Sequence, residues 1–343
     1  MRQRYVIFAL VLALVELIIA LQTAGAHETW FIGKGEHAGE HFAMELTNLL
    51  VVLGAILLAL SAFAIQRTSW FGNIDAFFEK TERLVPSGIR WRIVAILSGV
   101  MLIANAATGV FLAPDFVLPS DGLVVLGGVI QTVIGLLLVS QISFSLAGAL
   151  IVAVAMPLAA ICAPGSFLID YFVEYLALAL AFFFVGLSSI CPDKLACRWI
   201  NSDPGDSDHL PLLIIRAGLG LTLIVLSIHH KLANPDIALT FLDKYELNFI
   251  PYLGLTGFTN LHFVFAAGVT EVTFGLLLFV GIATRFVAAG LAVFLFTTLI
   301  ILGPVELVGH LPLIGITLLL LSARDRIAWV SQIPEARWGG NVA

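Results

Sequence analysis

The stretch GVTEVTFGLLL, residues 268–278, places the carboxylate of Glu271 in the middle of an apolar run. A related stretch, GVIQTVIGLLL, occupies residues 128–138 and has Gln131 at the matching position. The two stretches share six of eleven residues at an offset of 140. A match of this length at a fixed offset indicates an internal duplication. The fold is therefore expected to contain two copies of one unit.

The composition is typical of an integral membrane protein. Hydrophobic residues make up 60% of the chain, charged residues 12%, and the mean hydropathy is +1.04, far outside the range of soluble domains. Ten apolar runs approach the length of about 20 residues that a helix needs to cross a bilayer. They cover about 5–21, 44–65, 92–112, 122–140, 143–163, 167–189, 212–230, 261–282, 286–303 and 311–322.

The Lys and Arg residues predict the orientation, because short cytoplasmic loops retain them. With Arg2 and Arg4 inside, 14 of the 17 basic residues fall inside, and only Lys34, Lys231 and Lys244 fall outside. The chain is then a multi-pass protein of the bacterial inner membrane with a cytoplasmic C-terminus. The lipid bilayer is its expected partner. Neither the net charge of −6 nor any basic patch suggests nucleic acid.

The duplication extends beyond the opening motif. At the same offset, Pro164 aligns with Pro304 and Asp170 with His310. Each copy has four spans, an even number, so the copies share one orientation and form parallel repeats. The expected fold is all-α: two parallel four-helix units in a pseudo-twofold membrane bundle, preceded by an N-terminal signal or anchor helix and one extra transmembrane helix.

The domain organisation follows from these runs. The first, residues 1–26, reads either as a signal peptide with an A-x-A cleavage site before His27 or as an uncleaved anchor helix, since Glu16 interrupts its core. The remaining parts are an outer His-rich segment with one transmembrane helix and a cytoplasmic amphipathic loop (27–89), the first four-helix unit (90–200), a linker (201–213), the second unit (214–326) and a cytoplasmic tail (327–343).

The second unit resembles the DoxX family of four-helix membrane proteins. The resemblance is carried by Arg216 opening a glycine-bearing helix, by HHKLANP, by EVTFGLLLFVGIATR and by VELVGH before the closing helix. The first unit matches only weakly, and the opening AHETWF is similar to uncharacterised bacterial membrane proteins. The family includes members similar to the membrane subunit of thiosulfate:quinone oxidoreductases and others linked to thiol and oxidative-stress systems. The resemblance therefore implies a fold more firmly than a reaction.

Glu271 has two readings. Steps of three and four keep Gly268, Glu271, Gly275 and Leu278 on one helix face, where the glycines allow close packing and turn the carboxyl group toward protein. It is then a hydrogen-bonded packing residue, as Gln131 in the other copy suggests. Alternatively, the unfavourable free energy of an ionisable group at mid-membrane marks a functional site that carries protons.

Histidines favour the functional reading. The topology places seven of the eight at the outer face, and none lies in the first unit. The second unit is therefore expected to be the working copy and the first its structural partner. The candidate catalytic residues are Glu271, His310 and Glu306, and the candidate cofactor-binding residues are His229, His230, His262, Arg216 and Lys231. The alternative for each histidine is an interfacial residue that binds a loop carbonyl.

The outer N-terminal segment carries His27, His37 and His41. His37 and His41 are four apart, and imidazole nitrogens suit copper and zinc. If cleavage exposes His27 as the first residue, these three form a candidate copper site. The alternative is a polar cap over the bundle.

Three functions are compatible with this pattern. The first is a redox subunit, part of a quinone-linked oxidoreductase, that binds a quinone or metal at the outer His and Glu cluster and exchanges electrons with the respiratory chain. A second is a non-catalytic scaffold or assembly factor for a partner redox protein at the periplasmic face. A small-solute transporter is the third. The sequence leaves open whether the chain is catalytic.

Overall fold

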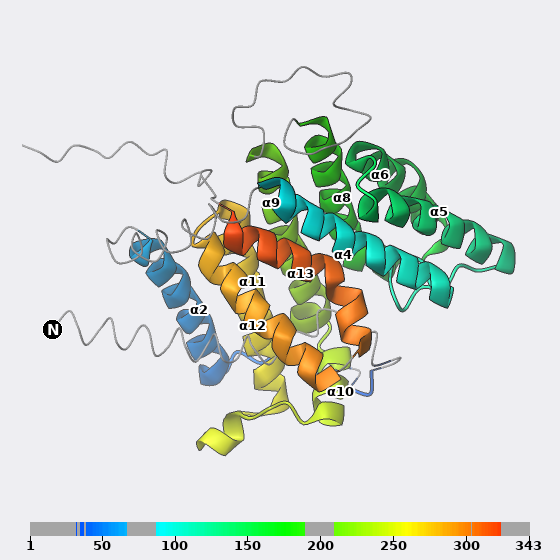
Figure 1. The fold of residues 1–343 in the computed structure, drawn as a ribbon. Coiled ribbons are helices and arrows are strands. Elements are labelled where there is room, and N and C mark those ends of the chain that lie inside the picture. Colours follow the sequence, from blue (N-terminus) through cyan, green and yellow to red (C-terminus); the bar gives the residue numbers. More distant parts are fainter. Residues whose placement is uncertain are drawn as a thin grey trace, which may run out of the picture.

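The computed structural model describes residues 32, 35–37, 39–66, 87–188, 209–302 and 304–323, with the side chains of 65, 87, 166 and 304–306 left out. Within these residues the chain is helical throughout and has no strand. The predicted signal or anchor helix, the amphipathic loop, the linker and the C-terminal tail lie outside the described residues. The all-α prediction is confirmed (Figure 1).

In the part of the chain that the structure describes, one helix precedes the first unit, which contains four apolar segments. The preceding helix is α2 (Leu46–Ile65). The unit consists of α4 (Ser87–Thr108), α5 (Asp121–Val139), a third segment that runs through α6 (Phe144–Leu150), the π-helical η2 (Ile151–Ala155) and α7 (Met156–Cys162), and α8 (Gly165–Leu187).

The second unit repeats this order with one insertion. It consists of α9 (His209–Ser227), the π-helical η3 (Ile228–Ala233), α10 (Asp236–Tyr245), the 3-10 helix η4 (Ile250–Leu253), α11 (Asn260–Val280), α12 (Thr284–Leu302) and α13 (Pro304–Ser322). The starts of α11, α12 and α13 follow those of α5, α6 and α8 at the offset of 140, to within one residue. Among the described elements, η3, α10 and η4 have no counterpart after α4, so the second unit has an elaborated connection between its first two long helices.

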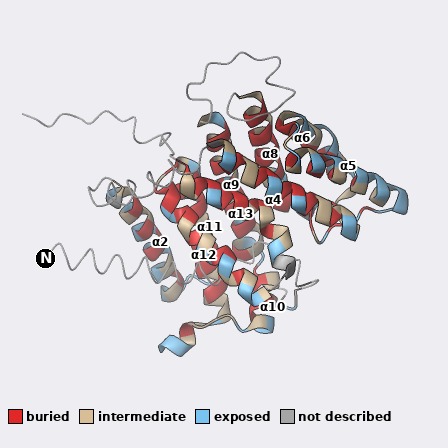
Figure 2. Cartoon of the chain, viewed as in Figure 1, coloured by how far each residue is buried: buried red, intermediate tan, exposed pale blue. Residues whose placement is uncertain are grey.

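Eight helices in the described residues are long and apolar enough to cross a membrane. A ninth apolar helix, Leu307–Ser322, is shorter and completes the second unit. Figure 2 shows that the helices at the edge of the bundle, α2 and α5, expose much more surface than α11 and α13 near its centre. On α5 the exposed side chains include Val125, Val129, Val133 and Leu136, an apolar stripe that suits lipid.

The first two long helices of each unit pack closely through glycine. A Cβ on Gly135 of α5 would lie 2.7 Å from the carbonyl oxygen of Gly99 on α4. In the second unit, a Cβ on Gly275 of α11 would lie 2.6 Å from the carbonyl oxygen of Gly220 on α9. Both contacts bring backbones together as small residues do in membrane helix pairs. The second glycine of the motif therefore has the same packing role in both copies.

The fourth helix of each unit packs against the first helix of the other. Helix α8 lies on α9, where a Cβ on Gly218 would come within 2.1 Å of the Cβ of Ala177. Helix α13 lies on α4, where a Cβ on Gly315 would lie 3.0 Å from the Cα of Val94. Figure 1 shows α13 alongside α4. Each unit thus completes the core of its partner.

The two ends of the bundle differ in chemistry. At one end, Arg90 Nη1 donates to the carbonyl oxygen of Ser322 at 2.6 Å, and Arg285 Nε donates to that of Ala323 at 3.1 Å. Buried Arg216 is at the same end, because Gly281, after α11, approaches its guanidinium. The other end, here called the α10 end, holds the histidine-rich connections. This separation agrees with the two faces that the basic residues predict, while the side of the membrane on which each lies stays a prediction.

Candidate functional site

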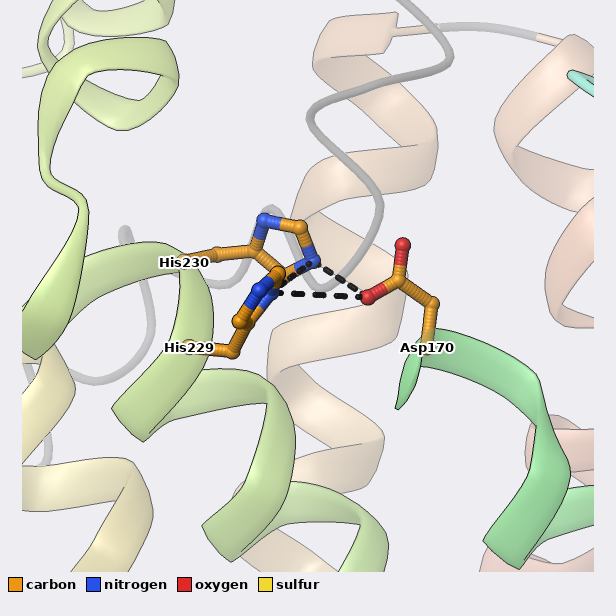
Figure 3. Close-up of side chains that lie close together, drawn as sticks. All are labelled: Asp170, His229 and His230. Atoms are coloured by element: carbon orange, nitrogen blue, oxygen red, sulfur yellow. Dashed lines mark hydrogen bonds and ion pairs between the residues drawn. The ribbon is translucent and has the colours of Figure 1, made fainter. Parts of the chain in front are cut away.

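Three side chains meet at the α10 end: Asp170 of α8 and His229 and His230 of η3 (Figure 3). His230 Nε2 lies 2.6 Å from Asp170 Oδ1, and His229 Nδ1 lies 3.8 Å from the same oxygen. The two ring nitrogens are 3.4 Å apart. Asp170 and His230 are largely buried, whereas 31% of the His229 side chain is exposed. The cluster joins the two units, because its aspartate comes from the first and its histidines come from the second.

A π-helical turn brings the two adjacent histidines together. Consecutive residues of an α-helix point about 100° apart, since a turn takes 3.6 residues. The segment Ile228–Ala233 forms a wider π turn, with more residues per turn, so neighbouring side chains diverge less. The rings of His229 and His230 lie edge to face with centroids 4.6 Å apart. Single π turns occur frequently at functional sites.

The cluster forms part of the wall of a cavity of about 520 Å³. A volume of this size falls in the range of about 300–1,000 Å³ that small-molecule sites occupy. The lining includes apolar residues, among them Phe116, Phe167 and Pro164, as well as imidazoles and carboxylates. The ring centroids of Phe116 and Phe167 are 4.4 Å apart. The cavity is thus amphipathic, and both units line it.

The N-terminal segment closes over this cavity and is tied to α10. The backbone N–H of His37 donates to Asp236 Oδ1 at 2.5 Å, and that of Glu36 donates to Thr240 Oγ1 at 2.8 Å. The His37 ring lies 2.7 Å from the carboxylate of Asp243. His37 and His41 both line the cavity. The sequence predicted a copper site with His37 and His41, separate from His229 and His230. In the structure all four histidines line the same cavity.

Behind the cluster, Lys231 and Glu271 form a buried ion pair. Lys231 Nζ donates to Glu271 Oε1 at 2.7 Å and to Oε2 at 2.8 Å. Ser227 Oγ also donates to Oε2, at 2.5 Å. Lys231 is 3% exposed and Glu271 is 6% exposed. The expected stripe holds, since Gly268, Glu271, Gly275 and Leu278 are all buried in protein.

Glu271 also faces a second, enclosed cavity, which is lined mostly by the second unit. This space is small, about 40 Å³, and mostly apolar, with Glu271, Glu174 of α8 and His310 of α13 among its walls. A buried space that can hold water needs about 10–15 Å³ for each molecule and polar partners. The cavity therefore suits one or a few waters between titratable groups, and not an organic solute.

The other candidate residues lie in different surroundings. His310 was expected at the outer face, but it is 2% exposed inside the bundle, where it shares the enclosed cavity with Glu271. His262 was grouped with His229 and His230, but its ring binds Glu45 at 3.1 Å and Thr259 as part of the α11 capping box. Arg216 lies at the opposite end of the bundle. The side chain of Glu306 and all of His27 lie outside the described residues.

The first unit is more than a structural partner, which corrects the expectation from the sequence. It supplies Asp170 to the histidine cluster and Glu174 to the enclosed cavity, and the sequence analysis proposed neither for the site. A signal for Glu174 was present, because it is an ionisable residue inside an apolar span, like Glu271. Asp170 lies in the same span and aligns with His310, but its partners could not be predicted, because they depend on the packing of α8 against α9.

A family comparison agrees with the helical arrangement. Residues 211–304 match the family model described as DoxX. The chain carries a DoxX domain. The DoxX domain spans α9 to the start of α13 and includes His229, His230, Lys231 and Glu271, so the resemblance seen in the sequence is confirmed. Asp170 and Glu174 lie outside the matched residues. No curated protein and no solved structure matches the chain.

Proposed function

We propose that this DoxX membrane protein is the membrane subunit of a quinone-linked oxidoreductase and binds a quinone head group in the cavity at the α10 end. The observation that carries the proposal is the composition of that cavity. Its aromatic residues suit the ring of a quinone, and its imidazoles suit the quinone oxygens. The cavity lies at the α10 end, where the described membrane-spanning helices end.

Buried titratable groups next to the cavity support this function. Reduction of a quinone to a quinol takes up two electrons and two protons. His230 lies in the cavity wall, and the next residue, Lys231, binds Glu271, which borders the enclosed cavity. We assign proton supply to these groups and electron supply to a partner redox protein docked at the same face. Ionisable residues within membrane spans commonly serve as such relays.

The transporter alternative finds less support. A midplane carboxylate suits proton-coupled transport, but the space beside Glu271 is only about 40 Å³ and admits water, not an organic solute. Scaffolding remains compatible with the exposed connections of the α10 end. It does not account for a largely buried Asp170 and His230 beside a cavity of about 520 Å³.

Photolabelling tests the proposal directly. The purified full-length protein, supplied with a photoreactive ubiquinone analogue, should be labelled once per chain, on peptides that contain residues 164–170 or 229–237. Phe167→Ala removes part of the apolar wall and should reduce labelling several-fold. His262→Gln changes a histidine at the same end that does not line the cavity, and should leave labelling unchanged. Label confined to the lipid-facing stripe of α5, or unaffected by excess unlabelled quinone, would refute quinone binding in this cavity.

A further inference from the structure

The ligand atoms of the histidine cluster lie near the spacing found around a bound metal ion. Ligand atoms about 2.0–2.2 Å from a tetrahedral ion lie about 3.3–3.5 Å from one another. The ring nitrogens of His229 and His230 are 3.4 Å apart, which falls in this range. Asp170 Oδ1 lies 3.8 Å from the His229 nitrogen, which is longer than the range, and 2.6 Å from the His230 nitrogen, which is shorter. A movement of the carboxylate oxygen by about 1 Å would bring all three separations close to tetrahedral spacing.

A simple ion pair between His230 and Asp170 leaves one ring unexplained. His230 Nε2 has at most one proton, which it can donate to Asp170 at 2.6 Å. His229 Nδ1 faces that same nitrogen, and at 3.8 Å from the aspartate oxygen it is too far away for a hydrogen bond. An ion between the three atoms would satisfy both imidazoles and the carboxylate together.

The charge of the cavity also favours a cation. Its described lining includes four carboxylates, those of Glu40, Asp115, Asp170 and Asp236, and no Lys or Arg. Lys231 follows His230 directly, but its amino group is bound to Glu271 and does not line the cavity. The strongest nearby positive charge is thus already neutralised, and the field at the histidines favours a positive ligand.

We propose that Asp170, His229 and His230 bind a divalent transition metal ion of the class of Zn²⁺, Cu²⁺ and Fe²⁺. Two imidazoles and one carboxylate are a ligand set that these ions accept while keeping an open position. The three atoms lie in the cavity wall, so the open position faces the cavity. The inference deepens the proposed function, because a quinone oxygen bound there could occupy that position. The site shares no ligand with the copper site that the sequence suggested.

Metal titration tests the site without any quinone. Full-length protein in detergent is stripped with EDTA and titrated with Co²⁺ and with Zn²⁺, and Co²⁺ absorption reports the coordination geometry. We expect one ion per chain. Asp170→Asn and His229→Gln should each weaken binding by at least about 100-fold, because loss of an outer partner of a ligand alone weakens it about 10- to 100-fold. His229 is the safer change for folding, since its side chain is 31% exposed.

Matched variants separate this proposal from quinone binding. His262→Gln alters a histidine that also contacts a carboxylate, Glu45, and should bind metal as the wild type does. Phe167→Ala should lose quinone labelling and keep metal binding. Melting temperatures of the metal-free variants check that each is folded. Absence of metal binding by the wild type, or unchanged affinity in both Asp170→Asn and His229→Gln, overturns the metal site and leaves the quinone result independent.

Discussion

The central polar residue of the repeated motif has different hydrogen-bond partners in the two copies. In the first unit, Gln131 is fully buried, accepts a hydrogen bond from the N–H of Leu112 at 2.7 Å and donates one to the carbonyl oxygen of Val110 at 2.9 Å. An amide has both donors and acceptors, so backbone groups of its own unit satisfy it. Gln131 is a structural residue that fixes the connection after α4.

In the second unit, Glu271 turns instead to side chains. An ionised carboxylate can only accept, and burial without a counterion would be strongly unfavourable. Lys231 and Ser227 supply the donors, and the inserted connection from η3 to α10 follows immediately after them. A buried amide such as Gln131 can be satisfied by backbone groups alone, whereas the carboxylate of Glu271 at the matching position requires a cation, here Lys231. The carboxylate and its cation form a titratable pair between two cavities in one copy only.

The largest effect is expected when the ion pair is broken. Lys231→Met leaves the Glu271 carboxylate buried without its cation, which should lower the free energy of unfolding by about 3–5 kcal/mol. The double variant Lys231→Met, Glu271→Gln removes both charges and should recover most of that loss. Unfolding of the detergent-purified proteins measures both. A single variant as stable as the double one would mean that the pair is not ionised.

A smaller effect is expected in the first unit. Gln131→Leu orphans two backbone groups, each worth about 1–3 kcal/mol when left unsatisfied in a buried site, or about 3 kcal/mol together. The same unfolding measurement applies. Metal affinity should stay at the wild-type value, since Gln131 hydrogen-bonds Val110 and Leu112, and neither of these lines the cavity. A changed affinity would show that the first unit influences the site through more than Asp170 and the cavity walls.

The smallest effect compares the first glycine of each motif. A Cβ on Gly128 has its nearest neighbour, the carbonyl oxygen of Ala106, at 3.8 Å, whereas one on Gly268 would lie 2.8 Å from Leu232 and 3.1 Å from the Cβ of Lys231. Gly128→Ala should therefore be neutral or stabilising by up to about 1 kcal/mol. Gly268→Ala should be destabilising by about 1 kcal/mol or more. Equal melting temperatures would contradict the asymmetry.

Much of the fold was predictable because it depends on local pattern. The length of each apolar run predicts a spanning helix, and the three- and four-residue spacing of Gly268, Glu271 and Gly275 correctly predicts a protein-facing stripe. The offset of 140 also predicts which helices correspond. These features depend on residues within one helix or on similarity between two.

The site was less predictable because it depends on contacts between units. His310 aligns with Asp170, yet His310 lies inside the bundle while Asp170 reaches the histidine pair. The difference arises because α8 packs against α9, whereas α13 packs against α4. The alignment of the two copies does not predict these contacts. The π turn at His229 and His230 also has no sequence signature comparable to a helix cap. The bound ligand, the partner and the membrane side stay predictions.

The exchange of fourth helices between the units has an evolutionary consequence. A single four-helix unit packed in this way would leave the face of its fourth helix that contacts the other unit uncovered, unless a second copy bound it in a twofold homodimer with every site present twice. Fusion of two such genes into one polypeptide removed that constraint. Each half could then mutate alone, and the present chain keeps the histidine pair on one side of the former dimer interface and its aspartate on the other.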